Sequence, residues 1–119
     1  MKYLSLCALL ILCFSGSVFG GEADVVAVES KKTGNQTYSF NVTVSHADQG
    51  WDHYADQWEI IAPDGEMLAK RVLAHPHTNE QPFTRSLGVQ VPQGTTQVQI
   101  EARCLVDGWT GQPVMVSLP

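Results

Sequence analysis

Residues 38–45 read YSFNVTVS, and this stretch decides the fold class. Its four apolar side chains alternate with four polar ones. A period of two is typical of a β-strand with one buried face. Residues 97–106 repeat the pattern, with Val98, Ile100, Ala102, Cys104 and Val106 on one face. We therefore expect two strands whose apolar faces share a core.

Five more short runs predict strands, at residues 24–30, 58–62, 67–73, 83–91 and 114–118. Turn-forming residues separate them, for example Pro63-Asp64-Gly65-Glu66 and Pro92-Gln93-Gly94. No helical stripe of useful length interrupts the series. Seven short strands predict an all-β chain, an immunoglobulin-like antiparallel β-sandwich of about seven strands. We expect one such domain over residues 21–119.

The N-terminus has the features of an export signal. Lys2 is followed by an 11-residue apolar region, Leu4–Phe14, interrupted only by Ser5, and then by the small residues Ser15, Gly16, Ser17, Gly20 and Gly21. We expect residues 1–20 to be cleaved as a signal peptide. A lipid anchor is not expected, because Leu12 precedes Cys13 where a small residue is needed. The mature protein is then periplasmic or secreted, without membrane insertion after cleavage.

The charge and the cysteine count narrow the possible partners. The chain has 12 Asp+Glu against 7 Lys+Arg, a net charge of −5, which argues against nucleic acid and anionic lipid as partners. Of three cysteines, Cys7 and Cys13 lie in the predicted signal. Cys104 alone remains, so an internal disulfide is excluded. It is a core thiol, an intermolecular partner or a metal ligand.

Two loops, residues 46–54 and 75–82, contain all four histidines. His46 and His53 stand near the two ends of the first loop, and His75 and His77 flank a proline in the second. Side chains two residues apart share a face in an extended segment, so the second pair can point the same way. Neutral imidazole and thiolate are ordinary ligands for transition metals. The candidate metal ligands are His46, His53, His75, His77 and Cys104, with Asp107 beside them.

Other interpretations of the same residues stand beside this one. A single cysteine on the core face of a strand is usually a small hydrophobic residue. A His-Pro-His sequence in a polar loop is often only solvated. The aspartates at 48, 52 and 56 lack the spacing of a calcium loop. No nucleophile elbow, phosphate loop or paired-carboxylate motif supports a hydrolase.

Residues 38–65 resemble the iron-binding domain of superoxide reductases, the desulfoferrodoxin and neelaredoxin family. The shared text is VTVSH ending at His46, DHY around His53, WEII from Trp58, PDG ending at Gly65, and Cys104-Leu105-Val106-Asp107-Gly108-Trp109. The resemblance implies an immunoglobulin-like fold with iron held by four histidines and one cysteine thiolate. His46, His53 and Cys104 match three of those ligands. The family's final histidine is Asp107 here, and no histidine precedes His46.

The chain also resembles, more closely, a group of exported bacterial proteins. The shared motifs are WDHYADxWE, here Trp51–Glu59, and HPHxxEQPFTR, here His75–Arg85. This second likeness implies no function. The sequence therefore leaves two hypotheses: an exported domain that binds a metal ion, with iron or copper favoured over zinc, and an interaction or structural sandwich without metal. Whether the metal hypothesis includes superoxide reduction stays open at this point.

Overall fold

The computed structural model describes residues 22–119. The predicted signal peptide, residues 1–20, lies outside the described residues. Seven strands make up the fold: β1 (Asp24–Gly34), β2 (Thr37–Ser45), β3 (Ala55–Ile61), β4 (Met67–Val72), β5 (Phe83–Gln90), β6 (Gln97–Cys104) and β7 (Val114–Ser117). Within the described residues, no helix is long and apolar enough to cross a membrane.

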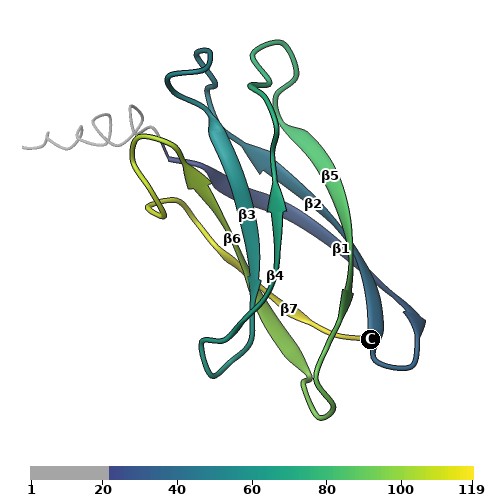
Figure 1. The fold of residues 1–119 in the computed structure, drawn as a ribbon. Coiled ribbons are helices and arrows are strands. Elements are labelled where there is room, and N and C mark those ends of the chain that lie inside the picture. The colour runs from purple at the N-terminus through teal and green to yellow at the C-terminus, as the bar shows by residue number, and fades with distance from the viewer. Residues whose placement is uncertain (1–21) are drawn as a thin grey trace, which may run out of the picture.

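The strands form two layers, which Figure 1 shows face to face. One sheet has the order β1-β2-β5 and the other β4-β3-β6-β7, and every pairing is antiparallel. This confirms the predicted all-β sandwich of seven strands. Strand β4 pairs with β3 and so belongs to the four-stranded sheet. In an immunoglobulin constant domain the fourth strand lies instead in the sheet of the first two strands.

The core lies between the sheets and follows the alternation in the sequence. In β2 every second residue is buried, and Phe40, Val42 and Val44 have no exposed surface. In β6 the buried residues are Val98, Ile100, Ala102 and Cys104. Full burial of a valine, isoleucine or phenylalanine side chain contributes about 1.5–3 kcal/mol to the stability of the fold. The core therefore rests on the two strands whose pattern is clearest.

The predicted continuation of β6 to a buried Val106 is wrong. The strand ends at Cys104, and Val106 is 61% exposed. The backbone N–H groups of Cys104 and Gly108 each donate to the other's carbonyl, at 2.9 and 2.8 Å. This closes a tight turn in which Gly108 has a φ of 74°. Such a φ favours glycine, and the turn lifts Val106 off the sheet.

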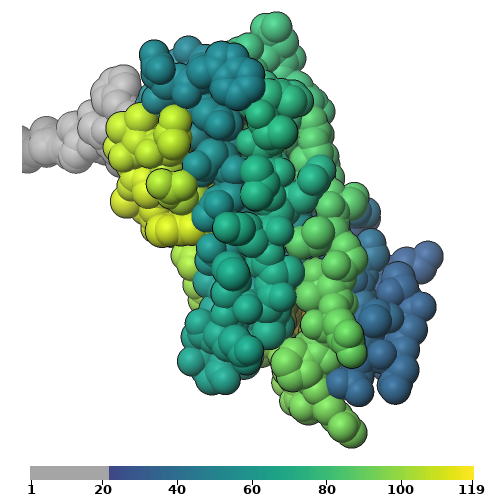
Figure 2. Space-filling view, in the orientation of Figure 1, coloured from purple at the N-terminus to yellow at the C-terminus, as the bar shows by residue number. Residues whose placement is uncertain are grey.

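Three loops meet at one end of the sandwich. The β2–β3 loop (residues 46–54), the β4–β5 loop (residues 73–82) and the β6–β7 loop (residues 105–113) each follow an even-numbered strand. Since neighbouring strands are antiparallel, these three connections emerge on the same side (Figure 1). The space-filling view shows all three covering that end (Figure 2). Both histidine loops and Cys104 are therefore at the same end of the molecule.

Candidate functional site

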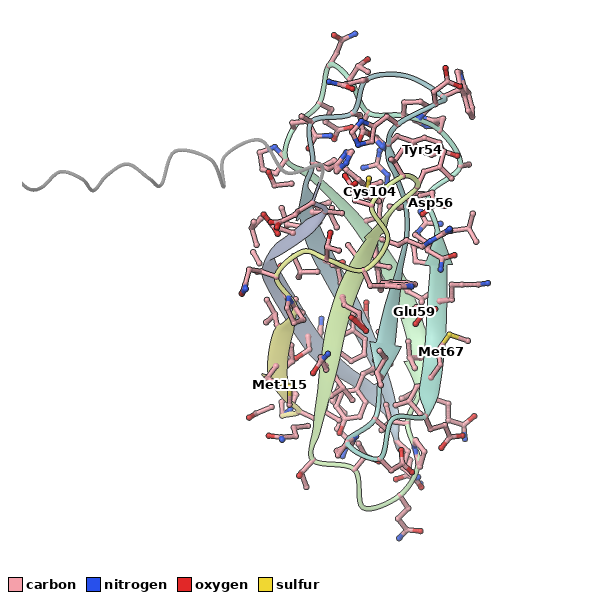
Figure 3. The ribbon with its side chains drawn as sticks, turned by 90° about the vertical axis from the view of Figure 1, so that its left-hand side faces the viewer. Tyr54, Asp56, Glu59, Met67, Cys104 and Met115 are labelled. Carbon is pink, nitrogen blue, oxygen red and sulfur yellow. The ribbon has the colours of Figure 1, made fainter. Side chains whose placement is uncertain are left out.

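Cys104 is the last residue of β6 and points into the sandwich. It continues the buried face of the strand, and it is fully buried. In Figure 3 it lies near the loop end of the sheet, close to Tyr54 and far from Met115. The backbone N–H of Asp107 donates to its sulfur at 3.3 Å. The turn after β6 thus holds the thiol in place.

His46 reaches the same point from the opposite sheet. It comes directly after β2 and extends the buried face of Val42 and Val44, which leaves it 3% exposed. Its Nε2 atom lies 3.3 Å from the Cys104 sulfur. The alternation of β2 therefore aims this imidazole at the thiol.

Asp48 fixes the orientation of His46. One carboxylate oxygen accepts a hydrogen bond from His46 Nδ1 at 2.5 Å and another from the backbone N–H of Ala55 at 3.0 Å. The second oxygen accepts from the backbone N–H of His77 at 2.6 Å. A carboxylate partner favours the proton on Nδ1, and in the neutral imidazole Nε2 then presents its lone pair to Cys104. A carboxylate behind a histidine is the usual support of a metal ligand.

Sequence reasoning considered Asp48 only as part of a calcium loop and missed this contact. The signal that would have found it is the spacing His46-Ala47-Asp48, an acid two residues from a candidate ligand in a short loop. Gln81 was missed as well. Its side chain accepts from the backbone N–H of His46 at 3.0 Å and donates to the carbonyl of His77 at 3.1 Å. Gln81 thereby ties the two histidine loops together.

His53 completes a three-residue cluster. Its Nδ1 atom donates to the side-chain oxygen of Gln49 at 3.0 Å, and its ring lies edge-on to that of His46, with centroids 5.1 Å apart. Its Nε2 atom is buried and has no hydrogen-bond partner among the described residues. This nitrogen is therefore available as a ligand atom, as are both ring nitrogens of His77, which have no hydrogen-bond partner either among the described residues.

The cluster has the dimensions of a metal site. One ligand atom each from His46, His53 and Cys104 lies within 4.8 Å of the other two. Two donors on a tetrahedral metal with bonds of about 2.0–2.3 Å lie about 3.5 Å apart. The 3.3 Å between His46 Nε2 and the Cys104 sulfur is close to that separation. Two imidazoles and a thiolate suit copper, zinc or iron.

Asp107 stands at the outer edge of the cluster. Its Oδ2 atom is 3.8 Å from His53 Nε2 and 3.8 Å from the Cys104 sulfur. Its side chain is 42% exposed, whereas the side chain of His46 has no exposed surface. Asp107 is the one carboxylate within reach of both His53 and Cys104 in the part of the chain that the structure describes.

The other two predicted ligands lie outside this cluster. His75 is exposed, and its ring centroid is 4.6 Å from that of His77, so the pair does share a face. His77 is buried and stacks on Phe83, with centroids 3.9 Å apart and planes 8° from parallel. Burial, together with the charges of Arg85 and His75, lowers the pKa of His77 below its ordinary value. His77 therefore contributes to packing and, through its backbone N–H, to holding Asp48.

The same atoms resemble a nucleophilic triad. The Cys104 thiol contacts the His46 imidazole, which in turn contacts the Asp48 carboxylate. This is the arrangement that activates a catalytic cysteine. However, the sulfur and both partners are buried, which does not suit a nucleophile that must attack a bulky substrate. A metal ion is small enough to lie among these side chains.

One comparison places the chain beside a longer protein. It is 40% identical over 95 residues to a protein of Halomicrobium mukohataei named "Putative lipoprotein". The match covers 80% of this chain and 47% of that protein, so the chain spans about half the length of this relative. No protein-family profile matches the chain, and no solved structure matches it.

Proposed function

We propose that this protein is an exported metal-binding protein that holds one copper ion through His46, His53 and Cys104. The observation that carries the proposal is the convergence of their three ligand atoms within 4.8 Å of one another. The unpartnered Nε2 atom of His53 and the Asp48 carboxylate behind His46 support it. A buried cysteine of purely structural use needs neither of these features.

Copper is favoured over iron by the donor set. Two imidazoles and one thiolate are the equatorial ligands of blue-copper sites, and soft thiolates also bind Cu(I) well. The iron site implied by the resemblance to superoxide reductases needs four imidazoles, and within residues 22–119 only two take part in the cluster. Copper binding is therefore the simpler proposal, and iron is its alternative.

The chain's own residues have separate tasks in this proposal. The Asp48 carboxylate keeps the Nδ1 proton on His46, and the Gln49 side chain keeps the Nδ1 proton on His53. Both Nε2 atoms then face inward as acceptors, which is the protonation state a metal requires. The Asp107 N–H group donates to the Cys104 sulfur and holds it in position. Bound copper would supply a site for one-electron exchange or for carriage of the ion.

Export is supported by the N-terminal sequence and by the relative's name. The predicted signal would release a periplasmic or secreted protein, whereas a lipoprotein keeps a membrane anchor on a cysteine. The two outcomes differ in the first residue of the mature chain. Mass spectrometry of protein from its native host should find Gly21 or Asp24 at the N-terminus. A lipid-modified cysteine at the N-terminus would instead show that the mature protein is anchored to the membrane.

Metal content and visible absorption test the function. Purified mature protein mixed with Cu(II), Fe(II) or Zn(II) and passed through a desalting column should retain one equivalent of copper. A copper–thiolate bond absorbs visible light, so colour should appear in the wild type and vanish in Cys104→Ser. His53→Ala should lose the ion, whereas His75→Ala, at an exposed imidazole outside the cluster, should retain it. A wild-type protein that retains none of the three ions would favour the interaction domain.

A further inference from the structure

His46 and Cys104 are buried, whereas the cluster is exposed to solvent at Asp107 and partly at His53. Cys104 has no exposed surface, and the His46 and Asp48 side chains have none either. The Asp107 side chain is 42% exposed. Two residues of the same loop are also at the surface, with Val106 61% and Trp109 39% exposed. The His53 side chain is 24% exposed, so solvent and solutes meet the cluster at the Asp107 carboxylate and along the edge of His53.

The backbone of Asp107 is held by several hydrogen bonds, whereas its side chain has only long contacts to the cluster. Its N–H donates to the Cys104 sulfur, and the paired hydrogen bonds between Cys104 and Gly108 close the turn around it. Its carboxylate lies 3.8 Å from both the sulfur and His53 Nε2, which is beyond an ordinary hydrogen bond to the imidazole. Rotation about the side-chain bonds is enough to bring an oxygen toward the cluster or to take it away.

The geometry points to Asp107 as a displaceable fourth ligand, which yields its place to an incoming thiolate and so lets copper leave the site. This inference rests on the proposed copper function. Among the four donors, the carboxylate is the hardest and the poorest match for Cu(I), which prefers sulfur and imidazole. An incoming thiol loses its proton to solvent as its sulfur binds Cu(I), and the carboxylate departs as the free anion. No electron is transferred in this exchange.

The exchange is tested by Cu(I) transfer to glutathione without oxygen. Protein loaded with Cu(I) is mixed with glutathione, and the copper remaining on the protein is followed over time. Asp107→Ala should speed transfer, and Asp107→His, which offers a softer imidazole, should slow it by about tenfold or more, a size typical of changes around a metal site. Asp52→Asn is the matched control, an exposed aspartate of the β2–β3 loop, and its rate should equal that of the wild type.

Co(II) gives a second readout, because its visible spectrum reports the number and kind of its ligands. Asp107→Ala should alter the spectrum of Co(II)-loaded protein, and Asp52→Asn should not. If copper binds in one equivalent but the Asp107 variants match the wild type in transfer rate and in the Co(II) spectrum, the inference fails and the copper function stands. If wild-type protein retains no copper, the proposed function itself fails.

Discussion

The Nε2 atom of His46 lies 3.3 Å from the sulfur of Cys104, across the gap between the two sheets. His46 follows β2 of the three-stranded sheet, and Cys104 ends β6 of the four-stranded sheet. Both residues continue the buried face of their strand beyond the apolar core. The polar cluster is therefore the last layer of the core at the loop end, and its geometry is set by the packing of the sheets.

Asp48→Asn should weaken copper binding by about 10–100-fold, the usual effect of losing the carboxylate behind a histidine ligand. Asp48 uses both oxygens as acceptors, toward His46, Ala55 and His77. Asparagine keeps one acceptor and turns a donor toward an N–H group, which should lower the unfolding free energy by about 1–3 kcal/mol. Competition with a chromophoric copper chelator and urea unfolding measure the two effects.

The control for this change is Asp52→Asn in the same loop, where both quantities should stay at the wild-type values. Asp52 is exposed, so the substitution tests the loss of a charge near the site without the loss of a buried acceptor. If Asp48→Asn is less stable but binds copper as tightly as the wild type, Asp48 only connects the loops and does not support a metal ligand.

Strand alternation predicted the fold because one face of each strand must be buried. The parity of β6 also placed Cys104 on the core side, as the structure has it, whereas the burial of His46 was not predicted. Loop geometry was not accessible in this way. The contacts of Asp48 and Gln81 depend on how three loops fold over one another, and no periodicity encodes that. The turn that exposes Val106 likewise depends on Gly108.

The sequence spacing of His75 and His77 predicted their mutual arrangement but not their contacts with the rest of the fold. Extended geometry predicts that His75 and His77 share a face, and their rings do lie 4.6 Å apart. What the spacing does not reveal is that Phe83, at the start of the next strand, offers a flat surface on which His77 stacks. Tertiary packing therefore decides whether the His77 ring stacks on an aromatic side chain or is free to bind a metal ion.

Gly111→Ala should destabilise the protein at the site end. A Cβ at residue 111 would lie 2.0 Å from the carbonyl oxygen of Ala23. This segment is held to β1 by two hydrogen bonds, from the N–H of Val25 to the carbonyl of Gln112 and from the N–H of Gln112 to Asp24. The clash should cost about 1–3 kcal/mol of unfolding free energy, because backbone atoms must move. Chemical denaturation measures the loss.

Gly88→Ala in β5 is the matched control for that substitution. A Cβ at residue 88 meets nothing within 4 Å. Alanine loses less backbone entropy than glycine in a strand, so the variant should gain up to about 1 kcal/mol. Equal stability of the two alanine variants would contradict the close approach of the β6–β7 loop to β1.

His77→Phe should reduce the loss of stability in mild acid. Burial, with Arg85 and His75, lowers the pKa of His77 below its ordinary value of 6.5. Above pH 6.5 both states are neutral at this residue, but below it the unfolded chain takes up a proton that the folded chain resists. Stability is therefore lost as the pH falls from 6.5 through the folded-state pKa.

Phenylalanine retains a flat ring for stacking on Phe83 and leaves the backbone N–H bond to Asp48 in place. Urea unfolding at pH values of about 7.5 and 5.5 gives the difference for each protein. The difference should be smaller in His77→Phe than in the wild type, and His75→Ala should change it less because His75 is exposed. An equal pH dependence in His77→Phe and wild type would contradict the prediction.

Copper should raise the melting temperature of the wild type, and Cys104→Ser should abolish the rise. An ion that binds only the folded state adds about 2.7 kcal/mol at a free concentration 100 times its dissociation constant. For a domain of 60–100 residues each 1 kcal/mol moves the melting temperature by about 4–8 °C, so the rise should be roughly 10–20 °C. Serine retains a donor toward His46 Nε2 but does not ionise as a thiol does, so the copper-free fold should persist.

The pH dependence of the copper-induced rise in melting temperature distinguishes binding to histidine ligands from a nonspecific effect of added salt. Imidazole ligands bind metal only when neutral, so the rise should shrink as the pH falls below about 6.5. His53→Ala should remove the rise while leaving the copper-free melting temperature nearly unchanged, because the His53 side chain is 24% exposed and lies in a loop. Differential scanning calorimetry with added copper and with chelator measures each case. Identical melting temperatures for the wild type under both conditions would contradict metal binding at this cluster, and Cys104 would then act as a core thiol only.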